Sequence, residues 1–142
     1  MKKILVTWML LITVVVSAQS NDADKIVGTY FTDGNEAKVT VARNNNKYYG
    51  TLVWTNVSDA ADKKNPDQNR RKDKLVGKVV LKDLAYNGKD TWENGTVYDP
   101  KSGKTYKCIV TIDKDGNLEV RGFVGVSFVG KTTVWTKIKQ RS

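Results

Sequence analysis

Apolar and polar side chains alternate with period two through most of the chain after residue 25, a pattern typical of half-buried β-strands. In segment 104–113, for example, one face carries Tyr106, Cys108, Val110 and Ile112. The pattern predicts eight strands and no long helix after residue 25. The predicted strands are Ile26–Thr32, Glu36–Arg43, Lys47–Asn56, Leu75–Leu84, Thr91–Tyr98, Lys104–Asp113, Leu118–Gly125 and Phe128–Lys139.

Short turn sequences separate most of these strands. They are Asp33-Gly34-Asn35, Asn44-Asn45-Asn46, Asn87-Gly88 and Asp113–Asn117. Such turns join antiparallel neighbours, and closing the sheet into a barrel removes its exposed edges. We therefore predict an all-β fold, a single antiparallel up-and-down barrel of about eight strands. A flattened sandwich, with or without Greek-key connections, is the alternative.

Two local expectations follow from the same pattern. In strand 47–56, strict alternation places Tyr48, Gly50, Leu52 and Trp54 on one face. Segment 57–74 is polar, contains Asn65-Pro66 and breaks the alternation, so it predicts a long loop with a helical turn at 58–63 capped by Ser58. A loop of this length is either a flexible crossing or a lid or binding loop.

The first 18 residues have the three parts of a secretory signal peptide. A basic start, Met1-Lys2-Lys3, precedes an apolar run at 4–16, and Val16-Ser17-Ala18 supplies a cleavage site. The run is too short for a stable membrane anchor, and no cysteine follows it to carry a lipid. The expected organisation is a cleaved signal peptide at 1–18, a polar lead at 19–24 and one barrel domain at 25–142. The protein is thus expected to be a bacterial protein that is exported to the periplasm or beyond the cell, with no stable membrane insertion after cleavage.

Composition narrows the chemistry. The chain has 24 basic and 15 acidic residues, a net charge of +9, which favours anionic partners or serves solubility. Nucleic acid is not an expected partner for an exported protein. Histidine is absent and Cys108 is the single cysteine, which excludes Ser-His-Asp and Cys-His catalysis and an intramolecular disulfide. No cofactor and no metal site is predicted, and Cys108 is interpreted as a small core residue.

Several short motifs carry a family resemblance. They include Gly50-Thr51-Leu52-Val53-Trp54, Asn65-Pro66, Leu75-Val76-Gly77, Asn94-Gly95, Tyr98-Asp99-Pro100 and Val120–Gly125. Together they resemble the exported bacterial family catalogued as domain of unknown function twenty-one forty-seven. The resemblance implies a small calycin-like barrel, the class of the lipocalins, without an assigned activity. Tyr30 departs from the tryptophan usual in that family, and we expect this to alter core packing only.

Nine residues are candidates for a site. A ligand-binding role is assigned as a hypothesis to Trp54, Arg70, Trp92, Tyr98, Arg121 and Trp135, and a polar rim or turn role to Asp62, Asn65 and Asp99. The tryptophans are alternatively core packing. Arg121 either closes a barrel end by stacking on a tryptophan or is a surface arginine. Asn65 and Asp99 are alternatively turn formers.

The sequence favours a non-catalytic exported barrel that binds a small, partly apolar or anionic ligand. An envelope-associated interaction module that uses the 57–74 loop is the second hypothesis. A carboxylate-based enzyme is the third and would require two perturbed carboxylates in one cleft.

Overall fold

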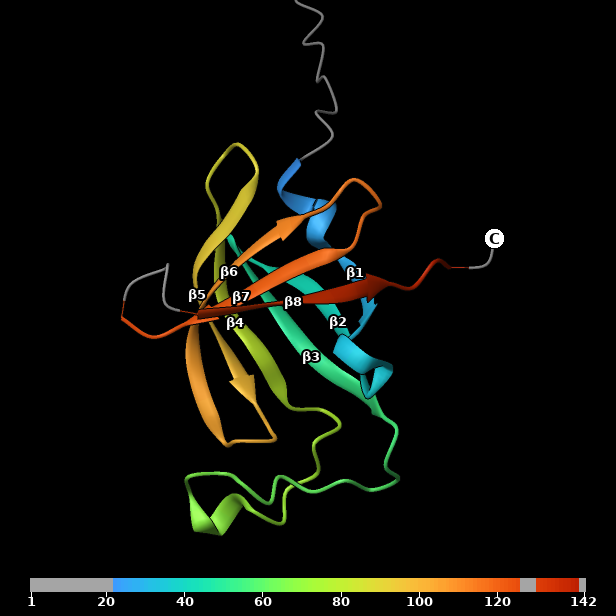
Figure 1. Ribbon diagram of the computed structural model, residues 1–142, viewed down its shortest axis with the longest axis vertical. Helices are drawn as coiled ribbons and strands as arrows, with labels where there is room; N and C mark the ends of the chain where they lie inside the picture. The colour runs from blue at the N-terminus through green and yellow to red at the C-terminus, as the bar shows by residue number, and fades with distance from the viewer. Residues whose placement is uncertain (1–21, 126–129, 141–142) are drawn as a thin grey trace, which may run out of the picture.

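Eight antiparallel strands form a closed barrel in which each strand pairs with the next and the last returns to the first (Figure 1). The computed structural model describes residues 22–125 and 130–140. The strands are β1 (Gly28–Phe31), β2 (Ala37–Asn44), β3 (Lys47–Thr55), β4 (Val79–Tyr86), β5 (Thr91–Asp99), β6 (Lys104–Ile112), β7 (Leu118–Phe123) and β8 (Gly130–Lys137). The predicted up-and-down barrel is confirmed, and the sandwich alternative is wrong. The predicted signal peptide, the first part of the polar lead and the first two residues of the last predicted strand lie outside the described residues.

Tight turns join the strands where the sequence predicted them. Between β2 and β3, Asn45 has a φ of 56°, the left-handed conformation that asparagine tolerates. Between β6 and β7, the Asp113 carboxylate accepts hydrogen bonds from the backbone N–H groups of Asp115 and Asn117. These local bonds replace ladder bonds at the turn and set the pairing of the flanking strands.

The barrel interior holds the hydrophobic core. Cys108 and Val110 on β6 are 1% and 0% exposed, as the alternation predicted. Other buried core residues are Val39, Val41, Leu81, Leu84, Leu118 and Val120. Burial raises the pKa of the Cys108 thiol to about 12, because the charged thiolate is disfavoured away from water. The interpretation of Cys108 as a core residue is confirmed.

A short 3₁₀ helix, η1 (Asp22–Ile26), covers one end of the barrel. Its backbone carbonyls accept hydrogen bonds from two buried rings, Trp92 Nε1 to Ala23 at 3.0 Å and Tyr30 Oη to Ile26 at 2.8 Å. Tyr48 Oη donates to the Asp24 carboxylate at 2.5 Å. Part of the expected polar lead therefore folds as a short helix that covers this end of the barrel. The strand β1 begins two residues later than predicted, because Ile26 belongs to η1.

Two predicted boundaries around the long loop are wrong. β4 begins at Val79 and not at Leu75, since the Leu75 N–H bonds to Ala60 O within the loop. The helical turn is η3 (Gln68–Arg70) and not 58–63, because the Asp67 carboxylate accepts the Asn69 N–H at the start of that turn. None of the helices in the described residues has the length and hydrophobicity needed to cross a membrane.

A β-bulge reverses the predicted orientation of Trp54. Lys38 of β2 pairs with Trp54, whereas the next residue pairs with Leu52, so one extra residue lies between them on β3. Trp54 therefore leaves the inward-facing set and is 40% exposed on the outer surface. There its ring meets Phe31 edge-on at 6.3 Å, and the Lys38 ammonium lies 5.1 Å and 5.2 Å from the Phe31 and Trp54 centroids.

Candidate functional site

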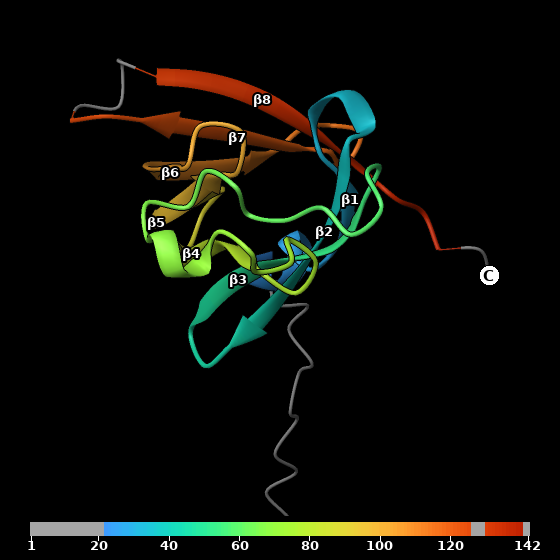
Figure 2. The same ribbon diagram turned by 90° about the horizontal axis from the view of Figure 1, so that it is seen from below.

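The end of the barrel opposite η1 is covered by one long connection. We call residues 56–78, which join β3 to β4, the closing loop. Seen from below, the chain leaving β3 crosses the end of the barrel before it returns to β4 (Figure 2). The hairpin between β5 and β6 lies at the same end (Figure 1). The predicted long polar loop is thus present, slightly longer than expected, and it lies at the barrel end that η1 leaves open.

A buried carboxylate fastens the closing loop to the barrel wall. Asp62 is 0% exposed, and its carboxylate accepts hydrogen bonds from three donors. The donors, which with Asp62 form the Asp62 cluster, are Lys78 Nζ at 2.7 Å, Asn65 Nδ2 at 2.8 Å and Tyr98 Oη at 2.5 Å. Tyr98 belongs to β5, so the cluster joins the loop to the wall across 36 positions of sequence.

The charge state of the Asp62 cluster follows from its contacts. Burial alone raises the pKa of Asp62, but the hydrogen bonds from Lys78, Tyr98 and Asn65 outweigh it and lower the pKa below its usual value. The pKa of Tyr98 is raised well above 10, first by burial and then by its bond to Asp62. At neutral pH Asp62 is therefore an anion and Tyr98 a neutral donor. A general acid needs the opposite shift, a carboxyl pKa raised toward neutrality.

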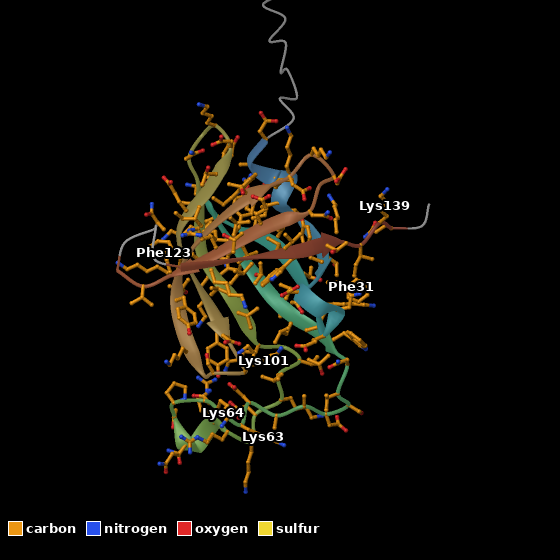
Figure 3. The ribbon with its side chains drawn as sticks, in the orientation of Figure 1. Phe31, Lys63, Lys64, Lys101, Phe123 and Lys139 are labelled. Carbon is orange, nitrogen blue, oxygen red and sulfur yellow. The ribbon has the colours of Figure 1, made fainter. Side chains whose placement is uncertain are left out.

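Backbone contacts hold the rest of the closing loop in place. Its two arms meet in an isolated bridge between Ala61 and Lys74, and the Asp62 N–H donates to Asp73 O at 2.8 Å. The β5–β6 hairpin presses against it at Gly103, where φ is +72° and an added Cβ would lie 1.9 Å from Lys64 O. Figure 3 labels Lys63, Lys64 and Lys101 of the hairpin, all at this end of the molecule. The closing loop is therefore packed against the hairpin by backbone contacts as well as by the Asp62 cluster.

A pocket of about 270 Å³ lies where the closing loop meets the outer side of the wall. Its lining residues are Asn65, Pro66, Lys78, Val80, Lys82, Thr96, Tyr98 and Thr105. Leu81 of β4 pairs with Val97 of β5, and both point into the barrel. Side chains alternate along a strand, so the lining residues on either side of these two point outward. They are Val80, Lys82, Thr96 and Tyr98. The pocket is thus outside the barrel interior, with the Asp62 cluster at one side.

The interior is less tightly closed at the loop end than at the η1 end. Val97, Tyr106 and Gly122 occupy inward-facing positions of β5, β6 and β7, and an added Cβ on Gly122 would contact both other side chains at 3.4–3.5 Å. All three residues are only partly buried, whereas Trp92 near η1 is 2% exposed. Although the closing loop crosses this end, these inward-facing positions are therefore partly exposed to solvent there. We call Val97, Tyr106 and Gly122 the inner cluster.

The six predicted ligand residues do not converge on one site. Trp92 and Trp135 are core residues, 2% and 7% exposed, and Trp92 also packs on Tyr86 with ring centroids 4.8 Å apart. Trp54 lies on the outer surface, as described above. The alternative interpretation of the tryptophans, as core packing residues, fits the positions of Trp92 and Trp135.

The two predicted arginines lie on the surface. Arg70 is in η3 and pairs with Asp73 at 3.1 Å. Arg121 alternates with the buried Val120, so it lies on the outer side of β7, and its Nη1 donates to Thr132 Oγ1 at 3.2 Å. This position corresponds to the surface alternative for Arg121.

The three predicted rim residues divide into two groups. Asp62 and Asn65 meet in the Asp62 cluster, together with the predicted Tyr98. Asp99 accepts hydrogen bonds from the Lys101 N–H and the Ser102 hydroxyl, so it forms the hairpin turn. Sequence reasoning missed Lys78, because nothing local marks this lysine as the partner of an aspartate 16 residues earlier. Within residues 22–125 and 130–140, no group of three or more His, Cys, Asp or Glu residues is placed to hold a metal ion.

These features define a class of protein. A closed eight-stranded up-and-down barrel with a short helix at one end and a long loop at the other is lipocalin-like in architecture. Among solved structures, the chain is similar to protein HP1028 from Helicobacter pylori, which is described as belonging to the lipocalin family. The two chains share 27% sequence identity with a TM-score of 0.74, over 80% of this chain and 83% of that one.

The sequence places the chain in a family. It belongs to the family described as uncharacterized protein conserved in bacteria (DUF2147), whose model matches residues 28–137. The family resemblance read from the motifs is confirmed. A comparison with curated proteins gave no match.

Proposed function

We propose that this protein is a non-catalytic binding barrel that takes a small ligand into its interior at the loop end. The observation that carries the proposal is the partial exposure of the inner cluster in a barrel whose other end is plugged by η1. Lipocalin-like architecture supports it, because eight-stranded barrels of this kind are wide enough to hold one small ligand. The signal-peptide pattern at 1–18 supports the further proposal that binding takes place outside the cytoplasm.

The residues at the loop end favour a ligand with an apolar body and a negative charge. Val97 and the Tyr106 ring provide apolar contact inside the barrel. Lys131 of β8 pairs with Gly122 and is exposed, which places a cation beside the inner cluster. An apolar surface bordered by a cation matches a small amphiphilic anion such as a fatty acid.

Displacement of a fluorescent fatty-acid probe from the purified protein tests this proposal. Gly122→Leu fills the space beside Val97 and Tyr106, and we expect it to weaken probe binding at least tenfold. Glu119→Gln is the matched control, since Glu119 is exposed on the outer side of the same strand and the change should leave binding unaltered. Equal binding by Gly122→Leu and the unchanged protein, with both folded by circular dichroism, would rule out the interior as the site.

A further inference from the structure

The outer pocket beneath the closing loop has its own chemical character. Its floor is formed by two cross-strand rows on the outer side of the wall. Lys82 pairs with Thr96, which pairs in turn with Lys107, and Tyr98 pairs with Thr105. The closing loop adds Asn65, Pro66 and Lys78 to the lining. This pocket is separated from the inner cluster by the barrel wall itself.

The charge that faces this pocket is positive. The two cations in its lining are Lys78 and Lys82, and the lining contains no acidic residue. Lys78 is neutralised by Asp62, whose carboxylate is already surrounded by three donors and is 0% exposed. Among the described residues, no carboxylate lies within ion-pair distance of Lys82. Lys82 is therefore the cation of the pocket that no carboxylate among the described residues neutralises. Lys107, on the far side of Thr96, adds to the positive potential there.

The neutral groups of the lining suit an oxyanion. Thr96 and Thr105 lie in the same lining as Lys82, and a threonine hydroxyl is a hydrogen-bond donor for an anion. An ammonium and two hydroxyls within one concavity give the charge-assisted bonds that phosphate and sulfate groups prefer.

The size of the pocket exceeds that of a bare inorganic ion. A volume of about 270 Å³ corresponds to roughly nine water molecules at ~30 Å³ each. Pro66 and Tyr98 in the lining supply apolar surface beside the polar groups, and the buried Val80 lies among them. The remaining space therefore matches a small apolar or aromatic body attached to the anion.

We propose that this outer pocket is a second binding site, for a small molecule that carries a phosphate or sulfate group on a compact apolar body. Lys82 holds the anion, Thr96 and Thr105 complete its hydrogen bonds, and Val80, Pro66 and Tyr98 contact the body. Because the Asp62 cluster positions Asn65 and Pro66, binding in this pocket also stabilises the closing loop.

Titration with phenyl phosphate, followed by amide chemical shifts of the purified protein, tests the proposal. We expect saturable shifts centred on Lys82, Thr96 and Thr105. Phenyl phosphate should bind more tightly than inorganic phosphate or phenol, because each of these lacks one half of the ligand. Phenyl sulfate distinguishes the two oxyanions.

Two variants locate the site. Lys82→Gln keeps a flexible polar side chain and removes the charge, and we expect about a tenfold loss of phenyl phosphate affinity. Thr96→Val keeps the shape of the threonine and should give a smaller loss. Lys114→Gln, in the exposed turn at the opposite end of the barrel, should change nothing.

Two results would overturn the proposal. One is a set of non-saturating shifts spread over lysines in general, which indicates screening of surface charge only. The other is unchanged affinity in Lys82→Gln. Gly122→Leu separates the two sites, since it should block the fatty-acid probe and leave phenyl phosphate binding intact.

Discussion

Replacing Asp62 with asparagine tests whether the buried cluster holds the closing loop on the barrel. Asparagine has the size of aspartate but lacks its charge, so the Lys78 ammonium loses its partner while its side chain is only 19% exposed. Removing one member of a buried ion pair typically costs about 3–5 kcal/mol, because the other charge stays desolvated. Since Lys78 reaches some solvent, we expect the lower end, about 3 kcal/mol.

Hydrogen exchange measures this effect where it should occur. The Leu75 N–H bonds to Ala60 O, and the Asp62 N–H bonds to Asp73 O, so both amides are protected only while the two arms of the closing loop are together. A loss of about 3 kcal/mol corresponds to roughly a hundredfold faster exchange at these amides. Amides of β6 and β7 serve as the internal control and should exchange as before unless the whole barrel is destabilised.

The pH dependence follows from the direction of the Asp62 shift. Its pKa is lowered in the folded protein, so the unfolded chain takes up the proton first as pH falls. The stabilisation is therefore fully present above the unfolded pKa of about 4 and is lost as pH falls through the folded value. The difference between the unchanged protein and Asp62→Asn, measured by urea unfolding and exchange, should be large at pH 7 and should shrink below about pH 4.

Equal exchange rates for the two proteins at pH 7 would refute this reasoning. So would an effect of the same size in Asp99→Asn, since Asp99 makes only turn contacts. The double variant Asp62→Asn/Lys78→Met removes both charges and should recover part of the lost protection, because no unpaired ion remains buried.

Two further predictions concern the core. Trp92→Ala should lower the free energy of unfolding by about 3–5 kcal/mol, since it empties a buried site. Trp54→Ala removes a side chain on the outer surface and should lower it by about 1 kcal/mol. Urea titrations of both variants measure the difference, and similar losses would contradict the bulge that exposes Trp54. In the folded protein at pH 8, Cys108 should resist a thiol reagent such as DTNB, because its pKa is raised to about 12. It should react after unfolding in urea. Rapid modification of the folded protein would contradict this prediction, since it would show that the thiol is accessible.

The strands and turns were predictable because their signals are local. A period-two pattern identifies inward residues such as Val39 and Val110 whatever the rest of the chain does. Asparagine and glycine mark hairpin turns because few other residues adopt the left-handed backbone, as Asn45 does. Tight turns join most neighbouring strands, so an antiparallel order followed, and closure removed the remaining edges.

The candidate site was less predictable. Tyr98, Asp62 and Asn65 were each named from the sequence, but as separate ligand, rim or turn residues, and Lys78 was not named at all. Their association depends on how a closing loop of more than 20 residues packs against the barrel, and no local sequence pattern specifies this packing. The outer pocket depends on the same contact, so it could not be read from Lys82 or Thr96 alone.

The sequence by itself therefore determined a family, an eight-stranded antiparallel order and most of the core. Only the tertiary structure decided which way Trp54 faces and what Asp62 binds. The physical reason is the same in both cases. One extra residue at a bulge inverts every later side chain of a strand, and a buried charge must find its partner in space and not in sequence.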